Sequence, residues 1–415
     1  MVKSEKAEGD EILSHLTDQG SFPTAKGQYC QNGIKILHVL IRLDPGGVET
    51  WLMQVLRRLD RKKFEIDFLV HSTKKGLYDD EALGLCAKIL VCPYPSKPWT
   101  YAANFLRLLR EQGPYQIIHT HLPRSGYIHL LARHAGIPVC IHHYHNDEII
   151  RRTHINWRRR FSLALSDRLI RQFATQGLAV SRVAALGAFG ANWQADPRWR
   201  IFPAVSELSS FTTPVNRQEV RKDLGLSESA FVLGHVGRFD AQKNHSFLID
   251  IAAEVCRLLP EAHLLLVGDG QLRPTIEEKV AQLGLTQRIV FTGIRTDVPR
   301  LMQGAMDAFL FPSIYEGMGM AVLEAQAAGL PCLITDTIPE EVAIVPELVR
   351  RVSLSAGARG WAEMVMDFIN NRVTLSAQEV AGRIRGTLFD LETNVLHLEA
   401  LYASALISGP QVSGQ

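Results

Sequence analysis

The sequence predicts an α/β fold of two doubly wound, Rossmann-like domains that face each other across a cleft. The prediction rests on two series of short apolar runs, on the helical stretches between those runs, and on a polar break between the series. Near-continuous apolar runs are typical of parallel strands that are buried on both faces. Strands that alternate with helices predict right-handed crossover units.

The first series predicts six strands, at residues 34–41, 65–71, 88–91, 116–121, 139–143 and 178–181. The second series predicts five, at 231–236, 263–267, 288–292, 308–311 and 332–335. Proline, serine and threonine cluster between residues 200 and 230, which predicts a domain boundary. We therefore expect a flexible extension at 1–33, one domain at 34–205, a second at 206–405 whose last helix can pack back on the first, and a flexible tail at 406–415.

Composition narrows the class of protein. The chain has 415 residues, of which 46% are hydrophobic and 21% charged, as in ordinary globular proteins. The formal net charge of +2 gives no global field that would attract nucleic acid, so we expect no nucleic-acid partner. The 6 cysteines form no C-x-x-C pair, no apolar run is long enough to span a membrane, and the first residues lack the apolar centre of a signal peptide. These features predict a cytoplasmic protein.

Gly46 and Gly47 lie in the loop that follows the first predicted strand and opens a helix. Paired glycines expose backbone N–H groups, so an anion could approach closely at this helix start. A simple tight turn is the alternative. The loop does not match G-x-G-x-x-G, so the dinucleotide fingerprint is missing here.

Histidines gather at the ends of two adjacent predicted strands. His119 and His121 share one face of their strand because side chains alternate along it. His142, His143 and His145 end the next strand. These rings could line the cleft, they could be ordinary polar strand ends, or they could bind zinc, although no obvious carboxylate or cysteine completes a tetrahedral site.

Arg238 and Lys243 lie five residues apart in the loop after the first strand of the second series. A forked guanidinium and a point-charged ammonium can together clamp a pyrophosphate. The alternative is a pair of solvated surface cations, but a position directly after a buried strand favours the clamp.

The segment from Glu316 to Glu324 follows the strand at 308–311. Its glycines leave free N–H groups at a helix start, where a phosphate is favoured. Glu316 falls in the loop and can accept hydrogen bonds from sugar hydroxyls. Glu324 falls two turns into an apolar helix, where an unpaired carboxylate would be costly, so a diol ligand is a suitable partner. Two solvated glutamates are the alternative.

The segment 151–171 is rich in arginine, with the aromatic residues Trp157 and Phe161 between. An aromatic and basic helix suits an anionic membrane surface, and a solvated helix face is the alternative. The arginines are Arg151, Arg152, Arg158, Arg159, Arg160, Arg168 and Arg171.

Together, Gly46-Gly47, His145, Arg238 with Lys243, and the E-x7-E element from Glu316 to Glu324 resemble the retaining glycosyltransferases of family 4, which have the GT-B fold. The resemblance covers about residues 34–400. The run from Glu316 to Met320 is most similar to the branch of the family that makes bacterial exopolysaccharides and capsules.

The resemblance implies a reaction: transfer of a sugar from a nucleotide diphosphate sugar, by default a UDP-hexose, to a saccharide or lipid-linked acceptor bound by the first domain. Arg238 and Lys243 would hold the diphosphate, Glu324 the ribose and Glu316 the transferred sugar, while His145 would contact that sugar near its reacting carbon. Family members need no metal ion, which fits the missing D-x-D motif. The resemblance also implies that the donor is bound by Gly46, Gly47, Ile294, Arg295, Met318, Gly319 and Met320, largely through the main chain.

One segment departs from the family. Its usual Asn-Gly-Val-Asp between the domains is replaced here by Pro203-Ala204-Val205-Ser206, so no role is transferred to these positions. A sugar-nucleotide epimerase of similar fold, or a non-catalytic nucleotide-sugar-binding protein, are the alternative functions.

Overall fold

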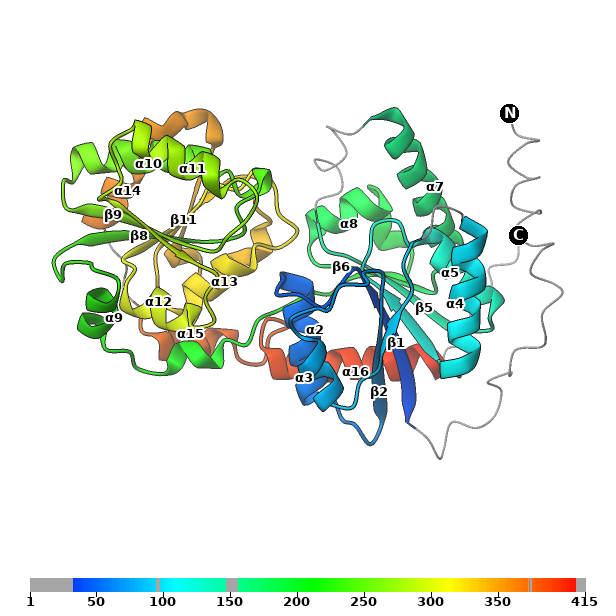
Figure 1. Cartoon of the computed structure of the whole chain (residues 1–415). Helices are drawn as coiled ribbons and strands as arrows, with labels where there is room; N and C mark the ends of the chain where they lie inside the picture. Colours follow the sequence, from blue (N-terminus) through cyan, green and yellow to red (C-terminus); the bar gives the residue numbers. More distant parts are fainter. Residues whose placement is uncertain (1–32, 95–97, 147–155, 372, 374, 408–415) are drawn as a thin grey trace.

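The computed structural model describes residues 33–94, 98–146, 156–371, 373 and 375–407. The chain forms two α/β domains, each built on one parallel sheet (Figure 1). This arrangement confirms the predicted fold class. The expected extension and tail lie outside the described residues, except Gly33 and residues 406–407.

The N-terminal sheet has seven parallel strands in the order β3-β2-β1-β4-β5-β6-β7. The strands are β1 (Ile34–Leu40), β2 (Phe64–Val70), β3 (Ile89–Val91), β4 (Ile117–Thr120), β5 (Val139–Tyr144), β6 (Gln176–Ala179) and β7 (Trp199–Ile201). Its helices are α2 (Gly47–Arg58), α3 (Asp79–Gly84), α4 (Pro98–Gln112), α5 (Gly126–His134), α7 (Trp157–Phe173) and α8 (Arg182–Phe189).

The C-terminal sheet has six parallel strands in the order β10-β9-β8-β11-β12-β13. They are β8 (Phe231–Val236), β9 (Ala262–Val267), β10 (Ile289–Gly293), β11 (Ala308–Phe311), β12 (Cys332–Thr335) and β13 (Val349–Val352). The helices are α9 (Arg217–Asp223), α10 (His245–Leu258), α11 (Arg273–Gln282), α12 (Val298–Gly304), α13 (Met320–Ala327), α14 (Gly357–Asn370), α15 (Ala377–Ile384) and α16 (Leu391–Ile407).

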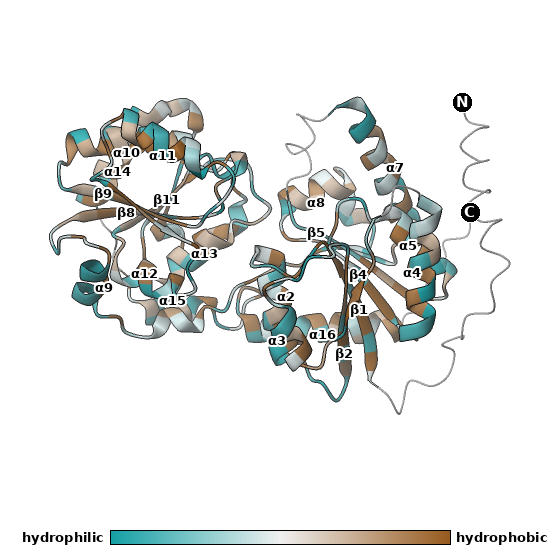
Figure 2. Cartoon of the chain, in the orientation of Figure 1, coloured by the Kyte–Doolittle hydropathy of each residue, from teal (hydrophilic) through white to brown (hydrophobic). Residues whose placement is uncertain are grey.

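Both faces of the N-terminal sheet are buried, as the apolar runs predict. Along β1, Leu37 and Val39 pack in a cluster with residues of α4 and α5. Ile36 and Leu40 point the other way, into a cluster with residues of α2 and α16. The strands of both sheets are accordingly coloured largely as hydrophobic in Figure 2.

The eleven predicted strands are all present, with ends that move by no more than two residues. Two strands were missed. β7 straddles the start of the stretch that we interpreted as a polar break, and that stretch also contains α9. β13 is an edge strand with two arginines in four residues, so it has no apolar run.

Helix α16 belongs to the end of the chain but packs on the N-terminal domain, against α2 (Figure 1). The Asn394 side chain is buried there: it accepts a hydrogen bond from the Trp51 indole (3.0 Å) and donates one to the Pro203 carbonyl (3.0 Å). The helix ends at Ile407, two residues into the segment that the sequence predicts as a tail. Among the described helices, none is long and apolar enough to cross a membrane.

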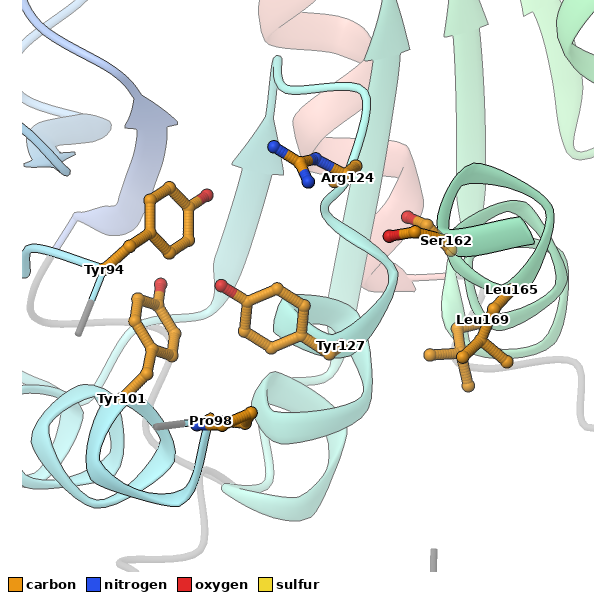
Figure 3. A pocket seen from close by; sticks show the side chains of 9 residues that line it. Tyr94, Pro98, Tyr101, Arg124, Tyr127, Ser162, Leu165 and Leu169 are labelled. Atoms are coloured by element: carbon orange, nitrogen blue, oxygen red, sulfur yellow. The ribbon is translucent and has the colours of Figure 1, made fainter. Parts of the chain in front are cut away.

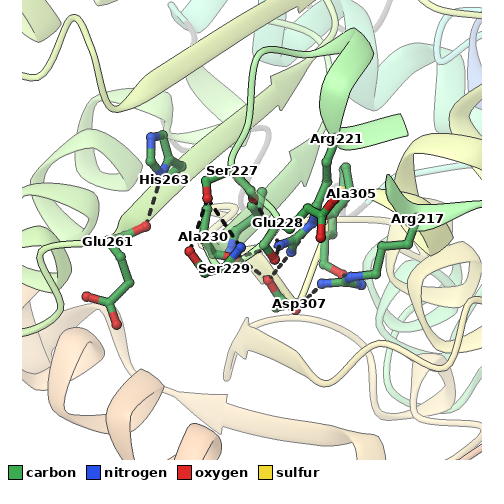
Figure 4. Close-up of polar contacts among 12 residues, drawn as sticks. Arg217, Arg221, Ser227, Glu228, Ser229, Ala230, Glu261, His263, Ala305 and Asp307 are labelled. Carbon is green, nitrogen blue, oxygen red and sulfur yellow. Dashed lines mark hydrogen bonds and ion pairs between the residues drawn. The ribbon is translucent and has the colours of Figure 1, made fainter. Parts of the chain in front are cut away.

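A buried arginine fixes the two central strands of the C-terminal sheet (Figure 4). The Arg221 side chain is 2% exposed and donates to the carboxylate of Asp307 (2.7 Å) and to the carbonyl of Ala230 (2.8 Å). Asp307 also accepts from the backbone N–H of Val232 on β8. A buried charge needs such partners, and the network ties α9 to the starts of β8 and β11. The site loops follow the other ends of these strands.

Candidate functional site

The predicted site loops follow strands at the points where the strand order of each sheet reverses. In the C-terminal sheet this is between β8 and β11, and in the N-terminal sheet between β1 and β4. Ligands of open parallel sheets bind in the crevice at this point, beyond the carboxyl ends of the strands. Arg238 and Lys243 follow β8, Glu316 follows β11, and Gly46 follows β1.

Lys243 and Glu316 form the centre of the C-terminal half of the site. The Lys243 ammonium lies 2.6 Å from Glu316 Oε1, and the two side chains are only 18% and 8% exposed. Gln242 donates to the other carboxylate oxygen, Oε2, at 3.0 Å. The Phe311 ring lies 4.7 Å from the ammonium and provides a cation–π contact. Lys243 is therefore a sheltered and firmly oriented cation, not a solvated one.

Arg238 behaves differently. Its side chain is 75% exposed and pairs with Asp240 at 2.9 Å, so of the two cations that the sequence predicts as a clamp only Lys243 is sheltered. Burial raises the pKa of Glu49, at the start of α2, and the positive charge of Arg238 acts in the opposite direction. Arg238 thus lies within electrostatic range of the N-terminal domain.

The start of α13 offers free N–H groups, as expected. Its cap residue, Gly319, has a φ of 86°, a left-handed conformation that favours glycine. Met318 is buried and Met320 is the first helical residue. Across the domain boundary, Met320 Sδ would lie 3.9 Å from a Cβ placed on Gly47, so the two helix starts approach each other closely.

Glu324 lies on α13 and accepts a hydrogen bond from the Ser206 hydroxyl at 2.7 Å. Burial raises the pKa of this carboxyl group, while the Ser206 bond and the charge of Lys243 lower it. Ser206 is the last residue of the segment that departs from the family and to which no role was transferred. Here it links the interdomain segment to the second glutamate of the E-x7-E element.

His145 meets the C-terminal domain through its backbone. A Cβ on Gly317 would lie 1.9 Å from the His145 carbonyl oxygen, so only glycine fits at this contact. Ile294 and Arg295 lie at the far edge of the C-terminal sheet, where Ile294 is exposed and Arg295 pairs with Asp297 at 2.7 Å. The structure thus brings Gly47, His145, Glu316 to Met320 and Lys243 to the domain boundary, whereas Ile294 and Arg295 lie farther out, directly after β10.

His145 ends a chain of hydrogen bonds that runs into the core of the N-terminal domain. Its Nε2 lies 2.9 Å from His121 Nδ1, and His121 Nε2 lies 2.9 Å from His38 Nδ1. The chain continues through the Tyr402 hydroxyl of α16, 3.4 Å from His38 Nε2, to His119 Nδ1 at 2.9 Å. His38 and Tyr402 were not anticipated, since 364 residues separate them.

These rings are neutral. Burial lowers the pKa of His38 to about 3, and it lowers the pKa values of His119, His121 and His145 well below the usual range. A neutral imidazole carries one N–H, so the bonds of the chain must all run in one direction. His119 Nε2, at the inner end, is buried and unpaired.

A buried lone pair without a partner costs less than a buried N–H without one, which favours donation toward His145. The neighbouring His143 follows the same rule: its Nε2 donates to the Phe202 carbonyl (2.8 Å), and only its bare Nδ1 stays unpaired. His145 Nε2 then accepts from His121, and its proton is held on Nδ1.

The zinc alternative has a partial basis in the geometry. Ring nitrogens of His38, His119 and His121, and those of His121, His143 and His145, each lie within 4.8 Å of one another. However, the shared His121 already bonds through both nitrogens, and no carboxylate or thiolate of the described residues joins either group. The donor set would leave a buried dication without counter-charge, so it fits a hydrogen-bonded core better than a metal centre. His142 points to the opposite face, toward Thr120.

The fold and the site define a glycosyltransferase with two Rossmann-like domains. A family model described as glycosyl transferases group 1 matches residues 216–383, and a glycosyl transferase 4-like domain matches residues 46–203. The chain therefore belongs to glycosyltransferase family 4, with the GT-B fold, as its motifs predict.

Several curated relatives are glycosyltransferases by name. A protein named as a glycosyltransferase, EpsF of Bacillus subtilis (strain 168), is 35% identical over 335 residues, which cover 80% of this chain and 86% of the relative. An Escherichia coli UDP-Gal:alpha-D-GlcNAc-diphosphoundecaprenol alpha-1,3-galactosyltransferase is 28% identical over 73% of this chain and 79% of its own length. The capsular polysaccharide biosynthesis glycosyltransferase CapH of Staphylococcus aureus is 24% identical over 89% of this chain and 99% of its own length.

Solved structures agree on the fold. HepE of Anabaena, in complex with UDP and glucose, superposes with a TM-score of 0.74 at 20% identity, over 89% of this chain and all of HepE. The lipopolysaccharide glycosyltransferase WaaG gives a TM-score of 0.63 at 17% identity, over 92% of this chain and all of WaaG.

The neutral histidine cluster predicts a specific loss of stability in acid. Unfolded histidines take up protons below a pKa of about 6.5, but these folded ones do not, so the free energy of unfolding falls as pH falls below that value. Each buried histidine contributes a loss of about 1.4 kcal/mol per pH unit in this range. The melting temperature should therefore drop between pH 7.5 and pH 5.5.

The variant His119→Phe removes one such group and the unpaired Nε2, so its melting temperature should drop less over the same pH interval. An equal drop in the variant, or no drop in the wild-type protein, would show that the cluster does not resist protonation.

Proposed function

We propose that the chain is a retaining glycosyltransferase that transfers a hexose from a UDP-hexose to a saccharide or lipid-linked acceptor in polysaccharide biosynthesis. One observation carries the proposal: Lys243 is held beside Glu316 and close to the start of α13. This place lies where the strand order of the C-terminal sheet reverses, which is where doubly wound sheets of this type bind nucleotides. The names of the relatives and the UDP complexes of HepE support the choice of donor and product class.

The cations of the C-terminal half face the leaving group. Lys243 stabilises the diphosphate from a fixed position, and Arg238 leaves Asp240 to complete the clamp when the donor enters. The N–H groups at the start of α13 and at Gly47 add backbone donors. Groups that are oriented before the reaction stabilise developing charge without reorganisation.

The two glutamates hold the two sugars of the donor. Glu324 already accepts from one hydroxyl, that of Ser206, and a ribose diol can replace or share this bond. Glu316, fixed by Lys243 and Gln242, accepts from hydroxyls of the transferred hexose. His145 donates from Nδ1 to the same sugar, and the main chain at Ile294 and Arg295 meets the base.

The transfer breaks the bond between the anomeric carbon and the diphosphate oxygen, and its electron pair goes to the leaving UDP. The acceptor hydroxyl attacks the same face of the oxocarbenium-like sugar and forms the new glycosidic bond. A diphosphate oxygen takes the acceptor proton. Because two protein cations meet the diphosphate, we propose that no metal ion is required.

Helix α7 supports a peripheral contact with an anionic membrane on the cytoplasmic side. Trp157, Phe161 and Leu165 are exposed and spaced four residues apart, so they form one apolar stripe. Arg158, Arg159, Arg160 and Arg168 are exposed on the same helix. Arg151 and Arg152, which completed the predicted basic segment, lie outside the described residues. A lipid-linked acceptor would make this contact useful.

The test of the proposed reaction is acceptor-dependent release of UDP. Lys243→Ala should lower kcat/KM for the donor by at least about 100-fold, because it removes a preorganised charge at the leaving group. Lys279→Ala, which removes a partly exposed ion pair with Asp250 and two bonds to Ser246 on the same domain, is the matched control and should leave the rate unchanged. Unchanged transfer by Lys243→Ala would place the site elsewhere, and UDP release without any acceptor would favour an epimerase.

Vesicle binding tests the membrane contact. The protein should sediment with phosphatidylglycerol vesicles, less with phosphatidylcholine vesicles, and less at high salt, because surface charge is screened. Phe161→Ser should weaken binding, whereas Leu258→Ser, which changes an exposed leucine of α10, should not. Equal binding of Phe161→Ser and wild-type protein would contradict the role of α7.

A further inference from the structure

A pocket in the N-terminal domain lies apart from the donor site. It has a volume of about 560 Å³ and is lined by residues of α4, α5 and α7 and of the loops after β3 and β4; Figure 3 shows these side chains. Tyr94, Tyr101 and Tyr127 form one wall, with Arg124 beside them. Leu165 and Leu169 of α7 form another. This volume is within the range of small-molecule sites.

The tyrosine hydroxyls converge. In Figure 3 the hydroxyl groups of Tyr101 and Tyr127 point toward each other beneath the ring of Tyr94. Tyr94 and Tyr101 stack with their centroids 5.4 Å apart, and Tyr127 meets Tyr101 edge-on at 5.1 Å. The rings are therefore fixed by one another, which is the rigid support that a binding site needs.

One of these hydroxyl groups lacks a well-formed hydrogen bond. Tyr101 is 2% exposed, and its hydroxyl interacts with that of Tyr127 but makes no hydrogen bond of good geometry with the described residues. A buried polar group without a partner costs free energy, so its retention calls for an explanation. A ligand that accepts a hydrogen bond inside the pocket would supply the missing partner.

The chemistry of the lining indicates an anion. Burial raises the pKa values of all three tyrosines, to about 12 for Tyr94, so each stays a neutral O–H donor at physiological pH. The Arg124 charge acts on Tyr94 and lowers that pKa in part, which places the guanidinium near the hydroxyl groups. No carboxylate occurs among the described lining residues, although sugar sites commonly use carboxylates to accept from hydroxyls. Hydroxyl and guanidinium donors together suit phosphate oxygens.

The opposite wall indicates a hydrocarbon chain. Leu165 lines the pocket and is also the inner end of the exposed stripe of Trp157, Phe161 and Leu165. This stripe is roughly 12 Å long at the rise of an α-helix. The stripe forms an apolar path from the pocket, where Arg124 and the tyrosine hydroxyls lie, to the exposed face of α7 that we propose contacts the membrane.

The pocket is also within reach of the transfer site. Arg124 is three residues beyond His121, whose ring bonds to His145 at 2.9 Å. Three residues span at most about 11 Å between α-carbons, so Arg124 and His121 both lie near the carboxyl end of β4.

We propose that this tyrosine pocket binds the polyprenyl diphosphate part of a lipid-linked saccharide acceptor. The diphosphate lies against Arg124 and the hydroxyl groups of Tyr101 and Tyr127, and the first isoprene units follow Leu165 and Leu169. The saccharide then extends toward His145. The inference rests on the proposed transfer reaction, of which it names the acceptor class and the acceptor site.

Binding to phosphatidylcholine vesicles that contain undecaprenyl diphosphate tests the proposal with the full chain. The controls are vesicles with undecaprenol, which lacks the phosphates, vesicles with the same negative charge supplied by phosphatidylglycerol, and inorganic pyrophosphate alone. The wild-type protein should bind the undecaprenyl diphosphate vesicles most tightly. Tyr101→Phe and Arg124→Gln should each weaken that binding by about tenfold or more, because each removes a bond to a charged group.

Stability separates a binding role from a structural one. Tyr101→Phe removes a buried hydroxyl that lacks a well-formed hydrogen bond, so its melting temperature should stay the same or rise. Tyr115→Phe is the matched control: it removes a buried hydroxyl that donates to Asp67 at 2.8 Å, so it should lower the melting temperature but leave vesicle binding unchanged.

Three results would overturn the proposal: unchanged binding by Tyr101→Phe and Arg124→Gln, equal binding to the undecaprenol or phosphatidylglycerol vesicles, or equally tight binding of pyrophosphate alone. UDP binding is measured in parallel and should be unaffected by Tyr101→Phe. If the wild-type protein does not bind UDP, that result would instead contradict the proposed reaction.

Discussion

The close contact between Lys243 and Glu316 is the interaction around which the rest of the site is arranged. An ammonium and a carboxylate that are both largely removed from water need each other and need further hydrogen bonds. Gln242 supplies one of these bonds, and the Phe311 ring covers the ammonium. Lys243 follows β8 and Glu316 follows β11, the two central strands of the sheet. At their opposite ends, Asp307 and Arg221 join these two strands. The position of the charge is thus set by the fold, and in the proposed reaction it would act on the diphosphate without further ordering.

The N-terminal domain supplies a second rigid support, of a different kind. Its centre contains neutral histidines that bond to one another and to Tyr402, so the orientation of His145 depends on the last helix of the chain. That helix also binds Trp51 and the segment between the domains through Asn394. The contact of Gly317 with the His145 carbonyl then joins the two supports. In this account the acceptor pocket, the membrane stripe of α7 and the transferred sugar meet at one end of the N-terminal sheet.

Much of this could be predicted from the sequence because apolar runs determine which segments become buried strands. The loops that carry Lys243 and Glu316 follow those strands, and Glu324 lies on the helix after one of them, so their approximate positions came with the fold. β7 and β13 were missed because short edge strands such as Trp199–Ile201 and Val349–Val352 carry charged residues and lack an apolar run. The bonds from Ser206 to Glu324 and from His38 to Tyr402 were missed for another reason: local pattern carries no signal for contacts between residues that are 118 and 364 positions apart. The tyrosine pocket combines three separate segments and was likewise invisible in the sequence.

The most direct measurement of the central claim compares the dissociation constants of UDP and uridine, by calorimetry, in the wild-type protein and in the double variant Lys243→Met with Glu316→Gln. The double variant removes both charges, so the Glu316 carboxylate is not left without its cation to repel the ligand. If Lys243 holds the diphosphate, the preference for UDP over uridine should fall by at least about tenfold in the variant, with little change in uridine binding. An equal preference for UDP in both proteins would contradict the account.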